Sequence, residues 1–113
     1  MSARGRKPAV ARIWEGRTRA AIADTYAAYL YEEGVKKIRA TEGNLGVQVL
    51  RRVRDGVAEF KTISYWSSRD EIRAYAGADI EQTHHLPKDA EYLLELPPHV
   101  QHFDVLVDEW SGQ

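Results

Sequence analysis

The dipeptide Asp55-Gly56 separates two stretches that are rich in branched and aromatic residues. A two-residue hairpin turn needs positive φ angles at both central positions, which Asp and Gly tolerate well. Residues 46–54 and 57–66 are therefore expected to form an antiparallel hairpin. Apolar residues occur on both faces of these two strands, so the sheet needs a cover on each face.

Before the hairpin, residues 10–15 are typical of a first strand that ends at Gly16. Thr18 is a plausible N-cap, because its hydroxyl can accept a hydrogen bond from a free amide of the next turn. Apolar residues then recur at intervals of three and four, which predicts a helix from about Arg19 to about Ile38.

After the hairpin, Ser68 and Glu71 match a capping box, which predicts a second helix directly behind Trp66. Gly77 interrupts the apolar pattern of this helix. A straight helix of about 1.5 Å rise per residue would carry His85 far from Trp66, so the chain must bend at Gly77 if the two are to meet.

A short helix is expected at residues 89–94 and a last strand at residues 102–107. The order strand, helix, strand, strand, helix, strand matches the ferredoxin-like split βαβ arrangement. The sequence thus predicts an α+β fold, with a four-stranded antiparallel sheet and helices on one face. The other face would then be apolar and exposed, which favours a homodimer.

The length of 113 residues suits one domain, which we expect at residues 9–113 behind a mobile basic tail at residues 1–8. The chain has no Cys, which excludes disulfides and thiolate metal sites. No apolar run approaches the roughly 20 residues of a membrane-spanning helix, and no secretory signal is recognisable. We therefore expect a cytoplasmic protein that does not bind membranes.

The charge distribution argues against a nucleic-acid-binding protein, and the histidine spacing argues against a metal site. The basic residues near the N-terminus are few and lack the stacking aromatics of a nucleic-acid reader, so no nucleic-acid partner is expected. The four histidines, His84, His85, His99 and His102, lack the i, i+4 spacing that directs two imidazoles at one ion. No metal site is predicted.

Several motifs resemble the antibiotic-biosynthesis monooxygenase family, which comprises small dimeric α+β barrels and includes haem-degrading members. They are the turn Gly43-Asn44-x-Gly46, the Asp-Gly hairpin and the junction Tyr65-Trp66-x-Ser68, within an element order that matches over residues 10–107. The resemblance implies a cavity in each subunit, bordered by Trp66 and His85, and a reaction with dioxygen that often needs no metal or organic cofactor. Haem-degrading relatives carry an Asn on the first strand, whereas residues 12–16 contain none, so a haem cofactor is disfavoured.

The candidate catalytic residues are His85, Trp66 and Glu15, and the candidate pocket residues are Trp14, Tyr26, Tyr75 and His84. Each also has a structural interpretation. Trp66 can simply anchor the third strand to the second helix, the histidines can mark a helix C-terminus, and Glu15 can pair with a nearby cation.

The predicted function is a cofactor-independent monooxygenase that acts on a hydrophobic, aromatic or quinol-like small molecule. In this mechanism His85 or Glu15 deprotonates a substrate hydroxyl, and the anion reacts with dioxygen beside Trp66. One alternative is a dimeric barrel that binds a small ligand, or acts in a stress response, without catalysis. A second alternative is a haem-binding or haem-degrading protein.

Overall fold

The structure is a computed structural model that describes residues 7–112. The basic tail predicted at residues 1–8 falls almost wholly outside the described residues. The elements are, in chain order, β1 (Val10–Arg19), the 3-10 turn η2 (Ala20–Ile22), α1 (Ala23–Leu30), the π-helical turn η3 (Tyr31–Val35), α2 (Lys36–Ala40), β2 (Asn44–Arg54), β3 (Val57–Trp66), α3 (Arg69–Ala76), α4 (Asp89–Tyr92) and β4 (Gln101–Asp104).

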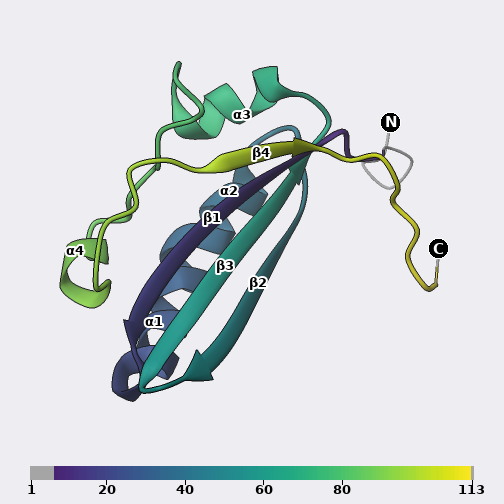
Figure 1. Ribbon diagram of the computed structural model, residues 1–113. Helices are drawn as coiled ribbons and strands as arrows, with labels where there is room; N and C mark the ends of the chain where they lie inside the picture. The colour runs from purple at the N-terminus through teal and green to yellow at the C-terminus, as the bar shows by residue number, and fades with distance from the viewer. Residues whose placement is uncertain (1–6, 113) are drawn as a thin grey trace.

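The four strands form one antiparallel sheet in the order β2-β3-β1-β4. In Figure 1, α1 and α2 lie behind this sheet, and α3 lies at the end where β3 stops. The connectivity is the ferredoxin-like split βαβ arrangement. The predicted α+β fold is therefore confirmed.

The Asp-Gly hairpin is confirmed as well. Asp55 and Gly56 have φ angles of 54° and 75°, and the strands pair from Arg54 opposite Val57 to Asn44 opposite Trp66. Two successive positive φ angles are those of a type I′ turn, whose twist matches that of the strands it joins. This turn sets which residues of β3 face the helices.

The two faces of the sheet differ in burial. The even-numbered residues of β3 from Ala58 to Trp66 point towards the helices and are buried, whereas the odd-numbered ones are half-buried or exposed. One apolar cluster forms around Tyr26 and Phe60, and a second forms around Trp66 and Ile72. We call the opposite side the open face; it carries the odd-numbered residues of β1 and β3 and the even-numbered residues of β2 from Gly46.

The first part of the chain differs from expectation in two respects. β1 does not end at Gly16, because its pairing with β3 continues to Arg19 opposite Val57. Thr18 is consequently a strand residue, its hydroxyl donates to the carbonyl of Arg19, and the predicted N-cap is wrong. The expected helix is present as consecutive 3-10, α, π and α pieces, with the π-turn spanning Gly34.

The second helix begins and ends close to where the sequence predicts. Ser68 is the N-cap residue of α3, but its side chain makes no capping hydrogen bond; instead the hydroxyl of Ser67 bonds to Glu71. Gly77 ends the helix with φ 91° and ψ −174°, a conformation that is essentially restricted to Gly. The predicted interruption at Gly77 is confirmed.

Residues 77–100, here called the covering segment, run between α3 and β4 with only α4 as regular structure. The segment packs onto the helix side of the sheet through Ile80 in one apolar cluster and through Leu86 and Leu93 in the other. After it, β4 is shorter than the strand expected at residues 102–107. No helix in the described part of the chain is long and apolar enough to cross a membrane.

Candidate functional site

Trp66 is fully buried where β3 meets α3, and its indole N–H donates to the hydroxyl of Ser64 at 2.9 Å. Its ring centroid lies 6.4 Å from that of Tyr75 on α3, which lies 4.7 Å from that of His84. The three rings form a row from the core to the covering segment. Trp66 anchors the inner end of this row, and Tyr75 and His84 line the cavity described next.

A small cavity of about 40 Å³ lies between the sheet, the helices and the covering segment. Its apolar lining includes Trp14, Tyr26, Leu30, Ile38, Leu86 and Val100, and its polar lining comprises Arg12, Thr62, Ser64, Tyr75, His84 and Asp89. The predicted pocket residues Trp14, Tyr26, Tyr75 and His84 thus all line one cavity. Alternation along β1 places Arg12 and Trp14 there, because they pair with Ser64 and Thr62 on the buried face of β3.

His84 and His85 differ in position. Burial lowers the pKa of His84, and the positive charges of Arg12 and Lys37 lower it further. The imidazole is therefore neutral at pH 7 and can accept a proton. Both side chains are exposed, but only that of His84 lines the cavity. The expected meeting of His85 with Trp66 does not occur.

Glu15 and Trp14 are neighbours on β1 that point to opposite faces. The carboxylate of Glu15 is on the open face, mostly exposed, and lies 3.7 Å from the ammonium of Lys61. It therefore cannot reach the cavity that Trp14 lines. The indole of Trp14 packs over Gly16, which has no side chain. A Cβ at Gly16 would lie 2.4 Å from the Trp14 ring.

Tyr26 and Asp89 join the covering segment to α1. The buried Tyr26 hydroxyl donates to Asp89 at 2.9 Å, and the other carboxylate oxygen accepts from the amide of Leu86 at 2.9 Å. Burial, with the nearby Asp89 carboxylate, raises the pKa of Tyr26, so the phenol stays protonated. Asp89 was predicted only as part of a short acidic helix, and nothing in its local sequence indicates this role.

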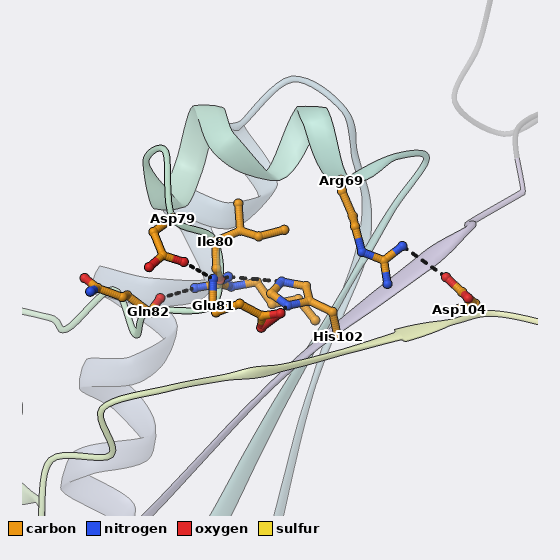
Figure 2. A network of polar contacts seen from close by, with 8 residues as sticks. Arg69, Asp79, Ile80, Glu81, Gln82, His102 and Asp104 are labelled. Carbon is orange, nitrogen blue, oxygen red and sulfur yellow. Dashed lines mark hydrogen bonds and ion pairs between the residues drawn. The ribbon is translucent and has the colours of Figure 1, made fainter.

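Arg12 joins the covering segment to β1 and was not a sequence candidate. Its guanidinium donates to the carbonyl oxygens of Ile80 and Gln82 and to Nε2 of His102, partners that Figure 2 labels. It also lies 5.9 Å from the ring centroid of Tyr75. Burial lowers the pKa of Arg12, although the group stays charged at neutral pH.

The His102 imidazole is held in one tautomer by this network. Nε2 accepts from Arg12, so the proton is on Nδ1, which donates to the carboxylate of Glu81 at 3.2 Å. Burial lowers the pKa of His102, and the nearby Arg12 charge lowers it further. His102 is therefore a neutral link between the buried cation and an exposed anion.

The size of the cavity limits what it holds in this conformation. Pockets for drug-sized ligands measure about 300–1,000 Å³, so about 40 Å³ is far too small for a ring system or for haem. Haem and a smaller ring system would therefore both require the covering segment to move. Among residues 7–112, no three His, Asp or Glu side chains are grouped as metal ligands.

A larger hollow of about 460 Å³ lies at the hairpin end of the open face. Its lining is largely charged, and these charges pair with one another, as in Arg17 with Glu95 and Arg52 with Glu59. Exposed pairs of this kind leave no group poised for chemistry. The smaller, buried cavity is therefore the better candidate site.

Comparison with known proteins identifies the fold. No protein-family model and no curated protein matches the sequence. Among solved structures, a proposed antibiotic biosynthesis monooxygenase from Bacillus cereus is 15% identical, with a TM-score of 0.62, 93% of this chain covered and 100% of the other. This likeness confirms the fold that the sequence resemblance predicted.

Two further structures with this fold contain ligands. The haem degrader MhuD from Mycobacterium tuberculosis, with two haems in its active site, is 18% identical over 89% of this chain and 99% of its own, with a TM-score of 0.60. The Streptomyces coelicolor monooxygenase ActVA-Orf6, in complex with nanaomycin D, is 16% identical over 97% and 98%, with a TM-score of 0.58. Identities this low establish a shared fold and leave the chemistry to be argued from the site.

Proposed function

We propose that this protein is a monooxygenase that uses dioxygen without a metal or organic cofactor and acts on an aromatic, phenol- or quinol-like compound. The row of rings formed by Trp66, Tyr75 and His84 carries this proposal, because it presents a neutral imidazole at the wall of a cavity that Trp14, Tyr26 and Tyr75 also line. The fold shared with ActVA-Orf6, which is known in complex with nanaomycin D, supports the same class of substrate.

In the proposed mechanism, His84 accepts a proton from an acidic C–H or O–H group of the substrate. The resulting anion is electron-rich and reduces dioxygen, so that one oxygen atom enters the product as a carbonyl. The second oxygen atom leaves as water with two hydrogens from the substrate. Tyr75 and Trp14 provide an aromatic wall that excludes bulk water, and Trp66 packs against Tyr75 from the core. Glu15 and His85 have no role in this proposal.

Anthrone is a suitable probe, because its oxidation to anthraquinone consumes one dioxygen and releases one water. We expect oxygen uptake with anthrone, and His84→Gln should lower the rate about 10²-fold, the lower end of the range for general base catalysis. His99→Gln is the matched control, because His99 is an exposed residue of the same segment that does not line the cavity. Equal loss in both variants would contradict the assignment of His84.

The pH profile gives a second readout of the same experiment. A lowered His84 pKa means that the neutral, proton-accepting form persists below the ordinary value of 6.5. The rate should therefore rise with pH and reach half its maximum below pH 6.5. Tight binding of anthrone without oxygen uptake would instead favour the alternative of a ligand-binding barrel without catalysis.

We also propose that two copies associate through the open face. Leu50 on β2 and Phe103 on β4 point to this side with 48% and 51% of their surface exposed, and Leu106 beyond β4 is 91% exposed. Figure 1 shows the chain after β4 running away from the sheet, where it can reach a second copy. Burial of such apolar surface is the usual source of stability in a homodimer.

A further inference from the structure

Arg12 is a buried cation whose direct partners are all neutral. Its side chain lies on the inner face of β1, the residue is 5% exposed, and it contacts two carbonyl oxygens, His102 and the Tyr75 ring. Among residues 7–112, no carboxylate forms an ion pair with it; Glu81 bonds to His102 instead. Burying a charge without a counter-charge is costly, so proteins normally pair such a group.

Thr62 lines the same cavity as Arg12 and provides an independent observation. Its hydroxyl is buried, and no hydrogen-bond partner for it is present in the described part of the chain. Thr62 lies on β3 opposite Trp14 and lines the cavity. A buried, unpartnered hydroxyl in a native structure indicates a group that binds something else, such as a ligand atom.

The remaining polar lining is rich in donors. The hydroxyl of Ser64 accepts from Trp66 and so keeps its own O–H to donate, while burial raises the pKa of Tyr75 and keeps its phenol protonated. The one carboxylate at the cavity, Asp89, is already bound through both oxygens. A cavity with a positive charge that no carboxylate contacts directly, several donors and no free acceptor anion suits a ligand oxygen with negative charge.

We propose that the cavity binds its ligand as an oxyanion, the phenolate or enolate form of a hydroxylated ring, with the charged oxygen between the guanidinium of Arg12 and the hydroxyl of Thr62. The reactivity of this anion rests on the proposed monooxygenase function, but its binding does not. Arg12 is thus the residue that determines specificity for ionisable substrates over neutral ones.

The same contacts explain how a larger ligand gains access. Arg12 donates to the carbonyls of Ile80 and Gln82, which belong to the covering segment. A ligand oxyanion is a stronger acceptor than a carbonyl and can replace these two contacts. The part of the segment around Ile80 and Gln82 is then released from Arg12, and the cavity enlarges on this side for the ring that carries the oxygen.

Binding without turnover tests this inference. Under anaerobic conditions, we would compare 2-hydroxy-1,4-naphthoquinone, which is ionised at pH 7, with neutral 2-methoxy-1,4-naphthoquinone by quenching of Trp fluorescence. The chain has no Cys for a quinone to modify. We expect about tenfold or greater preference for the ionised compound, from a charge-assisted hydrogen bond. Arg12→Gln should abolish this preference, and Arg12→Lys should retain part of it.

Arg17→Gln is the matched control, because Arg17 is on the same strand but points to the open face, where it pairs with Glu95. It should leave the preference unchanged. Equal affinity of the wild-type protein for both compounds, or a preference that survives in Arg12→Gln, would overturn the inference. If the protein prefers the ionised compound but takes up no oxygen with anthrone, the inferred binding of an oxyanion holds and the proposed monooxygenase function is wrong.

A second measurement needs no variant, in case Arg12→Gln does not fold. The absorbance of 4-nitrophenol reports its ionisation, and we expect protein-bound 4-nitrophenol to titrate at least about one pH unit lower than the free compound, the shift that a tenfold preference implies. The comparison is to be made just above pH 6.5, where His84, His102 and Tyr75 do not change charge: bound 4-nitrophenol should already be mostly ionised there, and the free compound mostly not. An unchanged or raised pKa of bound 4-nitrophenol would refute the inference.

Discussion

Asp89 is a buried carboxylate that links three parts of the structure. It accepts from the Tyr26 hydroxyl on α1 and from the Leu86 amide in the covering segment, and it begins α4. Both donors are neutral, and in the described part of the chain Asp89 forms no ion pair. The residue therefore contributes to stability through directed hydrogen bonds and not through charge pairing.

We predict that Asp89→Ala lowers the free energy of unfolding by about 2–4 kcal/mol, because it leaves two buried donors without a partner. Tyr26→Phe removes one donor and its bond, and should cost about 1 kcal/mol. Urea denaturation followed by fluorescence measures both. Asp24→Ala is the control, since the Asp24 side chain is 96% exposed and should change stability by less than about 0.5 kcal/mol.

A change for Asp89→Ala no larger than that for Asp24→Ala would contradict this role. It would show that the covering segment is held mainly by its apolar contacts, with Leu86 and Leu93 dominant.

At the scale of elements, the covering segment joins regular structure at Gly77. No other atom lies within 4 Å of the position that a Cβ would take there, so a substitution is opposed only by the backbone conformation. The segment is attached to the body by a few hydrogen bonds, including those from the Lys88 amide to the Tyr29 hydroxyl at 2.7 Å and from the Leu94 amide to the Arg17 carbonyl at 2.8 Å. Such a segment opens more easily than a strand or a helix.

We predict that Gly77→Ala destabilises the protein by about 1–3 kcal/mol, the cost of this backbone conformation for an L-residue. Because the strain is relieved when the segment detaches, protease cleavage within residues 77–100 should become faster. Gly112→Ala is the matched control, because Gly112 also has a positive φ and open surroundings but lies at the end of the chain. Equal cleavage rates in the two variants would argue against a hinge at Gly77.

The elements themselves are mostly predictable from sequence, for local reasons. Asp55-Gly56 fixes the hairpin, and Gly77 fixes where α3 ends, because both depend on backbone conformations that few residues adopt. Thr18 shows the limit of local rules. Its hydroxyl suits an N-cap, but pairing of β1 with β3 extends past it and outweighs the local preference.

The site is less predictable, because its decisive contacts join residues far apart in the chain. Arg12 meets Ile80 across 68 residues, and Tyr26 meets Asp89 across 63. Neither separation leaves a pattern in a single sequence. Trp14, Tyr26 and Tyr75 are predictable because aromatic residues on the inner faces of amphipathic elements converge on one core, whereas His84 is a candidate only as the neighbour of His85.

At the scale of the whole molecule, we predict a homodimer of two 12.9 kDa chains in light scattering at micromolar concentration. Phe103→Glu should dissociate it, because each copy would then bury a charge in the interface at a position that pairs with Ala11 of β1. Tyr31→Glu is the control, since Tyr31 is 54% exposed on η3, on the helix side.

A wild-type protein that is a stable folded monomer would contradict this prediction. Equal dissociation by Tyr31→Glu would place the interface on the helices instead of on the open face.

The short β4 has a consequence for how the protein avoids aggregation. β4 pairs with β1 only from Val10 to Ile13, so in the described structure the outer edge of β1 beyond this point has no strand beside it. An unpaired edge can template the addition of foreign strands. Glu15, Arg17 and Arg19 place charges of both signs along this stretch, and the amide of Leu94 bonds to the carbonyl of Arg17. We therefore expect the charges of Glu15, Arg17 and Arg19 to discourage other chains from pairing with this edge.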